Sequence, residues 1–151
     1  MCAVDKRVTV QVEIGERDGP MTVNLVDFNY KGPLLAIDES DKKIVNSLKA
    51  IQVAMEMFGC GSDYIKSVSV SSDVPIGKGM GSSAAFSVAV VAGIKVATCQ
   101  QEANVDKPAI FEAAWRLEQI FHGVSSGVDI CPSVYGGICR YNMERWESVE
   151  K

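Results

Sequence analysis

What the sequence lacks excludes several classes of protein. The 151-residue chain has no excess of basic residues, and its formal net charge is −4. Nucleic acids and anionic membrane surfaces select for basic patches, so we expect neither as a partner. The longest apolar stretch, residues 84–97, contains Ser87 and Lys95 and is too short to cross a bilayer. No repeat, linker or low-complexity segment divides the chain, which predicts a single unit.

The cysteines also lack the spacing of a known framework. There are five of them and no CxxC pair. An odd number in a chain of this length argues against a disulfide framework, and the spacing argues against a zinc site. The first 15 residues are charged and alternating, unlike a signal peptide. We therefore expect a globular protein in the reducing cytoplasm.

Alternation of apolar and polar residues predicts the strands. Two alternating stretches within residues 7–30 predict a β-hairpin, which residues 31–33 (Lys-Gly-Pro) would end. Residues 64–72 predict a third strand, with Val68 and Val70 facing inward. Two shorter strands are predicted near the end of the chain, at residues 138–142 and 146–149.

Apolar stripes at helical spacing predict the helices. They cover residues 44–58, 82–98, 106–121 and, as a short helix or turn, 130–135. Ser40 or Asp41 can cap the first helix and Gly59 can end it. Asp106 and Pro108 form a start signal for the third. The order of elements is not a regular βαβ alternation, so we predict an α+β fold with a mixed or antiparallel sheet packed on helices.

A glycine-rich stretch, PIGKGMGSS at residues 75–83, joins a predicted strand to a predicted helix. The first turn of a helix leaves N–H groups unpaired, and its dipole adds about half a positive charge. Glycines let such a backbone approach an anion closely, which favours a phosphate site. The hydroxyls of Ser82 and Ser83 stand where one can cap the helix and the other can contact a metal ion. The alternative is a turn that only permits close packing of helix on strand.

Two common phosphate motifs do not fit this loop. In the Walker A motif the lysine follows the final glycine, whereas Lys78 precedes it here. A dinucleotide fingerprint needs a surrounding βαβ unit, which the predicted elements do not provide. Lys78 can still add positive charge near a bound phosphate.

Two carboxylates, Glu118 and Asp129, stand eleven residues apart. Phosphoryl transfer needs a magnesium ion on the phosphates and a group that orients or deprotonates the attacking hydroxyl. Magnesium prefers carboxylate and phosphate oxygens. Glu118 can therefore hold a metal and Asp129 can act as the base. Alternatively, Glu118 belongs to a solvated helix face, Asp129 caps the next turn, and His122 is a helix-end residue.

The two segments together resemble the GHMP small-molecule kinases. Residues 73–85 are similar to their ATP loop, Pro-x-x-x-Gly-Leu-Gly-Ser-Ser-Ala, with Met80 in place of Leu. Residues 118–137 are similar to the mevalonate kinase branch, which carries Glu, then His-Gly-x-Pro-Ser-Gly-Val/Ile-Asp, then Tyr/Trp-Gly-Gly. The resemblance implies Mg²⁺ ligands at Ser83 and Glu118 and a catalytic aspartate at Asp129. It also implies contacts to the ATP phosphates from Lys78, Gly79, Met80, Gly81, Ser82 and Ser83.

The resemblance carries expectations about fold and activity. It implies a fold like domain 2 of ribosomal protein S5, with residues 1–151 as part of an N-terminal domain and the C-terminal ferredoxin-like domain absent. It implies ATP-dependent phosphorylation of a small alcohol, most simply mevalonate. Ser125 stands where these enzymes have Pro, and Ile130 where they have Asn, which leaves phosphomevalonate open as the acceptor. A non-catalytic nucleotide-binding or assembly module is the other alternative.

The family members also carry a first strand and a second domain that this sequence does not match. Catalysis depends on positioning both substrates and excluding water. We therefore expect weak nucleotide binding and very little turnover from the 151-residue chain alone. Uncovered apolar surface would favour a homodimer or association with the missing half.

Overall fold

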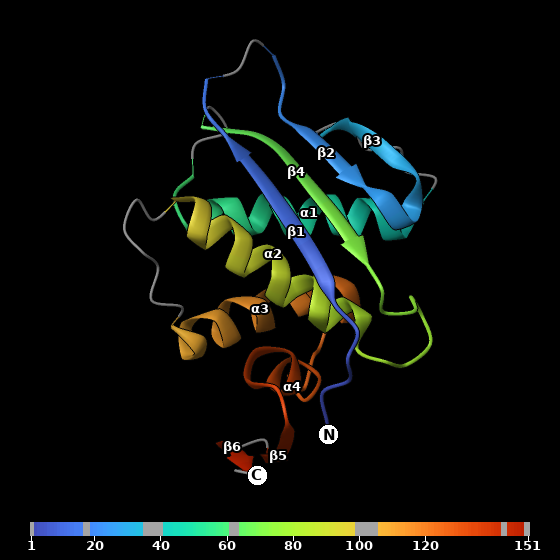
Figure 1. The fold of residues 1–151 in the computed structure, drawn as a ribbon, viewed down its shortest axis with the longest axis vertical. Coiled ribbons are helices and arrows are strands. Elements are labelled where there is room, and N and C mark those ends of the chain that lie inside the picture. Colours follow the sequence, from blue (N-terminus) through green and yellow to red (C-terminus); the bar gives the residue numbers. More distant parts are fainter. Residues whose placement is uncertain are drawn as a thin grey trace.

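The computed structural model describes residues 2–16, 19–34, 41–60, 64–98, 106–142 and 145–149. Its main sheet has four strands in the order β1-β4-β2-β3 (Figure 1). They are β1 (Val8–Ile14), β2 (Thr22–Leu25), β3 (Tyr30–Pro33) and β4 (Ile65–Ser72). β4 is antiparallel to β1 and parallel to β2, and β2 is antiparallel to β3. The prediction of an α+β fold with a mixed sheet is confirmed.

The prediction of a hairpin over residues 7–30 is wrong. β4 lies between β1 and β2, so that Val68 pairs with Val12 on one side and with Val23 on the other. Val23 and Val68 are fully buried, with no exposed surface. β4 therefore takes an inner place although it begins about 40 residues after β2 ends. Val68 and Val70 face inward as predicted.

The second alternating stretch is also shorter than predicted. It breaks after β2 into a 3₁₀ turn, η1 (Val26–Phe28), and the chain reverses at Asn29. Asn29 has a φ of 53°, a left-handed conformation that asparagine tolerates better than most residues. The prediction that residues 31–33 end a strand is wrong, because they belong to β3.

The predicted helices are confirmed. They are α1 (Lys42–Met57), α2 (Ser82–Thr98), α3 (Lys107–His122) and α4 (Ile130–Tyr135). The Asp41 carboxylate accepts the N–H of Lys43 at 2.8 Å and so caps α1, whereas Ser40 lies outside the described residues. Asp106 caps α3 in a similar way. Gly59, with a φ of 63°, follows the end of α1.

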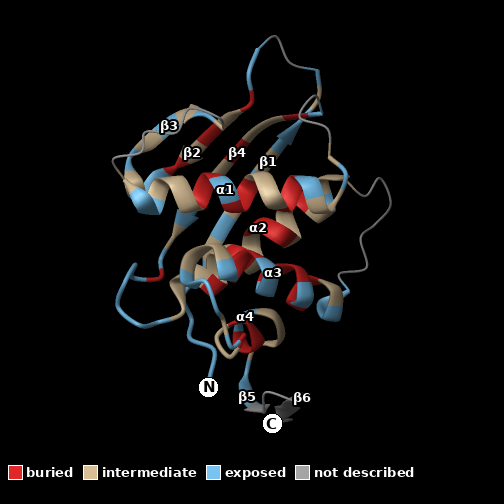
Figure 2. Cartoon of the chain, turned by 180° about the vertical axis from the view of Figure 1, so that it is seen from behind, coloured by how far each residue is buried: buried red, intermediate tan, exposed pale blue. Residues whose placement is uncertain are grey.

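The helices lie in layers against one face of the sheet. Figure 1 shows α1 and α2 against the strands, with α3 below them and α4 below α3. The buried residues gather on the facing sides of these layers (Figure 2). A Cβ built at Gly93 of α2 would lie 3.0 Å from Val10 Cγ1 of β1. The absence of a side chain at Gly93 is therefore what lets α2 cross β1 so closely.

A second, two-stranded sheet ends the described chain. It pairs β5 (Ile138–Asn142) with β6 (Arg145–Val149), which confirms both predicted strands. The first residues of the chain lie next to the start of this sheet, where the Ala3 N–H donates to the Gly137 carbonyl at 2.8 Å. The chain before β1 therefore passes beside α4. Among the described residues, no helix has the length and apolarity that crossing a membrane requires.

Candidate active site

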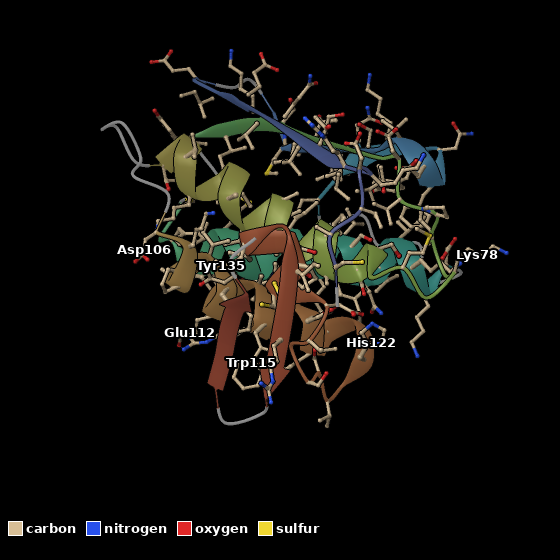
Figure 3. The ribbon with its side chains drawn as sticks, turned by 60° about the horizontal axis from the view of Figure 1, so that its bottom comes forward. Lys78, Asp106, Glu112, Trp115, His122 and Tyr135 are labelled. Carbon is tan, nitrogen blue, oxygen red and sulfur yellow. The ribbon has the colours of Figure 1, made fainter. Side chains whose placement is uncertain are left out.

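The glycine-rich stretch forms an exposed loop between β4 and α2. Gly77, Gly79 and Gly81 have φ values of 73°, 70° and 67°, a left-handed conformation that glycine adopts without a steric cost. Lys78 and Met80 are both exposed. Figure 3 shows the Lys78 side chain at the tip of the loop, pointing away from the body of the molecule. The loop backbone, rather than the lysine, is thus the part that adjoins the start of α2.

Two helix starts face one cavity next to this loop. The cavity has a volume of about 480 Å³, and Ser82 and Ser83 line it from the first turn of α2. Lys42 and Lys43 line it from the first turn of α1. Unpaired helix N–H groups and lysine side chains both favour an anion. The remaining lining is largely apolar and includes Leu25, Phe28, Val70, Phe86 and Phe121.

Ser83 belongs to a polar cluster that joins α2 to the end of α3. Its Oγ lies 3.0 Å from His122 Nε2, and the same nitrogen lies 3.6 Å from Glu118 Oε1. Glu118 and His122 are four residues apart on one helix face. Sequence reasoning took His122 as a helix-end residue and missed this contact. The four-residue spacing from Glu118 indicates that the two side chains share a helix face, but it does not indicate that His122 meets Ser83.

Glu118 is buried, with 3% of its surface exposed. The interpretation of Glu118 as part of a solvated helix face is therefore wrong. Burial raises the pKa of Glu118, while the hydrogen bond from Ser83 and the nearby His122 lower it and the charge of Asp129 raises it further. Within the described part of the chain, Glu118 Oε1 accepts no hydrogen bond. Its distance to His122 Nε2 is 3.6 Å.

Asp129 reaches the cluster from the loop that follows α3. It precedes α4, but its side chain makes no capping hydrogen bond, so the interpretation of Asp129 as a side-chain cap is not supported. A Cβ built at Gly81 would lie 3.3 Å from Asp129 Cβ, which places the carboxylate against the glycine-rich loop. Asp129, Gly81 and Met80 line a second cavity of about 420 Å³, with Lys6 and Arg7 at its rim. Asp129 is near enough to Glu118 for its charge to raise the pKa of Glu118, whereas Ser83 and Asp129 line different cavities on either side of the start of α2.

The donor set fits a magnesium ion that is shared with phosphates. No three His, Cys, Asp or Glu side chains form a metal site within the described ranges. Mg²⁺ commonly takes only one or two protein carboxylates and completes its shell with substrate phosphates and water. Glu118 Oε1, which accepts no hydrogen bond among the described residues, and the Ser83 hydroxyl, which contacts the same His122 nitrogen, are oxygen donors that match that requirement.

The described elements form an α+β domain in which a glycine-rich loop leads into the start of a helix. The family model of the GHMP kinases N terminal domain matches residues 44–137, which is most of the chain. The chain belongs to the GHMP kinase family, as the resemblance in its sequence predicted.

Proteins similar to this chain are mevalonate kinases. The chain is 28% identical to the mevalonate kinase of Pyrococcus abyssi, over 97% of this chain and 45% of that protein. It is 27% identical to that of Thermococcus gammatolerans, over 97% of this chain and 46% of that protein. The crystal structure of Methanococcus jannaschii mevalonate kinase has the same fold, with a TM-score of 0.74 at 20% identity over 97% of this chain and 47% of that chain. The chain therefore spans less than half the length of the relatives it matches.

Replacing Glu118 by Gln is expected to have opposite effects on stability and on metal binding. Because the pKa of Glu118 is raised above its ordinary value of 4.5, its contribution to stability is full below pH 4.5 and is lost as the pH rises through the folded pKa. Above that window we expect Glu118→Gln to raise the free energy of unfolding by about 1 kcal/mol, because a neutral amide costs less to bury than a charge. Urea denaturation at several pH values between 4 and 8 measures the difference.

The same variant is expected to weaken Mg²⁺-dependent nucleotide binding, because it replaces the carboxylate that the family resemblance implies as a Mg²⁺ ligand. Isothermal titration with ATP, with and without Mg²⁺, gives this second readout. A variant that is destabilised at pH 7, or that binds MgATP like the wild type, would contradict the assignment. Glu112→Gln on the exposed face of α3 is the matched control.

Proposed function

We propose that this chain is the N-terminal part of an ATP-dependent kinase that phosphorylates a hydroxyl group of a small acid, with mevalonate as the acceptor. One observation carries the proposal: the Ser83 hydroxyl and the carboxylates of Glu118 and Asp129 converge beside the start of α2. Curated relatives that match almost the whole of this chain are mevalonate kinases, which supports the choice of acceptor.

The first turn of α2 supplies the phosphate contacts. Its unpaired N–H groups and the backbone of Gly79 and Gly81 stabilise the negative charge of the ATP phosphates. Ser83 and Glu118 would hold Mg²⁺, which would neutralise phosphate charge when bound. Lys78 remains a candidate for a further phosphate contact once its loop meets the nucleotide.

Asp129 acts on the hydroxyl group of the acceptor. Its carboxylate has no structural role as a cap and lies beside Gly81, on the side of the second cavity. From there it can orient the acceptor hydroxyl and take its proton as the oxygen attacks the terminal phosphate. Lys6 and Arg7 stand at the rim of this cavity and favour an acceptor with a negative group. A carboxylate and a phosphate both meet that requirement.

Titration of the 151-residue chain with MgATP, followed by a single-turnover assay with γ-labelled ATP, tests the proposal. We expect weak binding that Ser83→Ala weakens further, and slow transfer of label to mevalonate. Faster transfer to phosphomevalonate than to mevalonate would make phosphomevalonate the acceptor. Binding of MgATP without transfer to any acceptor would favour the non-catalytic module instead. Binding that Ser83→Ala leaves unchanged would contradict the phosphate site.

A further inference from the structure

A tryptophan of α3 is bonded to the loop that carries Asp129. The indole Nε1–H of Trp115 donates to the carbonyl oxygen of Ser125 at 2.8 Å. Trp115 lies two turns before the end of α3, and 39% of its surface is exposed. Figure 3 shows it on the same helix as His122, farther from the loop of Lys78. The bond therefore joins the outer face of α3 to the segment that leads to Asp129.

Two further side-chain bonds of this loop are local. The Ser125 Oγ accepts the N–H of Gly127 at 3.2 Å, and the Ser126 Oγ accepts that of Val128 at 3.5 Å. Such bonds shape the turn but do not fix it relative to α3. Gly127 has a φ of 75° and adds backbone freedom. The Trp115 bond joins the middle of this turn to α3, and the Gly123 N–H, which donates to the Gln119 carbonyl at 2.7 Å, joins its start to the same helix.

We propose that Trp115 is a positioning residue for Asp129. Its indole N–H holds residues 123–128 against α3, and the backbone of that loop sets where the Asp129 carboxylate lies. Asp129 has no side-chain cap bond of its own, so its place beside Gly81 follows from the backbone that leads to it. The consequence for catalysis rests on the proposed function, whereas the positioning itself does not.

A substitution at Ser125 can compensate for loss of the hydrogen bond from Trp115. Its φ is not positive, and no hydrogen bond from its amide is recorded in the described part of the chain. Proline at this position would remove no recorded donor and would restrict φ to about −65°, but it would also remove the Oγ that accepts the Gly127 N–H. Ser125→Pro and the Trp115 bond are two ways to restrain the same turn.

The test compares Trp115→Phe, Ser125→Pro and the double variant in the full 151-residue chain. Phenylalanine keeps an aromatic ring but loses the N–H. Amide exchange at Val124, Ser126 and Val128 should accelerate about fivefold in W115F, as loss of one net hydrogen bond implies, and return to the wild-type rate in the double variant. Residue 125, which has no amide hydrogen as proline, and Gly127, whose acceptor S125P removes, are left out of this comparison. E112Q, on the same helix, should leave the exchange unchanged.

The amide resonance of Gly81 reports on Asp129 itself. D129N defines how far this resonance moves when the carboxylate is altered. In W115F we expect a shift of at least half that size, reversed by S125P, which a loss of helix stability alone would not produce. A Gly81 resonance that stays in place, or that S125P fails to restore, overturns the proposal. If W115F does not fold, the double variant decides: a native Gly81 resonance supports the proposal, and an unfolded or shifted one overturns it.

Neither of these measurements requires phosphoryl transfer. A chain without kinase activity can therefore still confirm or refute the role of Trp115. Conversely, a Trp115 that fails this test leaves the roles of Ser83 and Glu118 intact.

Discussion

Replacing Asp129 by Asn is expected to lower the rate of acceptor phosphorylation by about 10²- to 10⁴-fold, the range of a lost general base. Asparagine has nearly the same shape as aspartate but neither its charge nor its basicity. The wild-type carboxylate makes no capping hydrogen bond, so its loss should leave α4 and the fold intact. Single-turnover transfer from γ-labelled ATP to mevalonate, with protein in excess, measures the change even when the rate is low.

The affinity for MgATP separates this effect from a general disruption. Because Ser83 and Glu118 rather than Asp129 are assigned to the metal, D129N should bind MgATP within about a factor of two of the wild type, a change worth less than a typical hydrogen bond. Equal transfer rates for D129N and the wild type would show that Asp129 does not act on the acceptor. Transfer and binding lost together would place it in the phosphate site instead.

Replacing Gly81 by Ala is expected to impair the site more than the same change at Gly79. Both glycines have left-handed backbone, with φ values of 67° and 70°, so either substitution costs about 1–2 kcal/mol of stability. A Cβ at Gly81 would also lie 3.3 Å from Asp129 Cβ, whereas one at Gly79 would meet nothing within 4 Å. Relief of that contact requires the start of α4 to move. A displaced base of this kind costs about 10- to 100-fold in rate.

The pair of variants isolates the contact with Asp129 from the backbone strain. Urea denaturation should give similar losses of stability for G81A and G79A. Acceptor phosphorylation should fall further in G81A, and G81A should shift the resonances of Asp129 more than G79A does. Equal effects of both substitutions on transfer and on the Asp129 resonances would mean that the contact between Gly81 and Asp129 does not affect the transfer rate.

Local features of the fold were predictable from the sequence because the signals are local. The stripe of α1, the cap at Asp41 and the reversal after Gly59 each depend on residues within a few positions of one another. The failed prediction was a pairing between strands. Alternation shows which face of a strand is buried, but it does not show which strand lies beside it. β4 was therefore not expected between β1 and β2.

The candidate site was also predictable from the sequence only in part. The types of residue at Ser83, Glu118 and Asp129, and their resemblance to a kinase family, were readable in the chain. The burial of Glu118, the contact of His122 with Ser83 and the hydrogen bond from Trp115 to Ser125 were not. Each of these depends on where α3 crosses α2 or where a loop returns to its helix, and side-chain patterns do not encode such distances.

The sequence by itself determined the helices, the glycine-rich loop and the kinase family, because periodicity, turn chemistry and motif spacing act over short separations. Only the tertiary structure decided the strand order and the meeting of Ser83, Glu118 and Asp129. The physical reason is that packing of whole layers sets these distances, and the free energy of that packing is shared among many residues far apart in the chain.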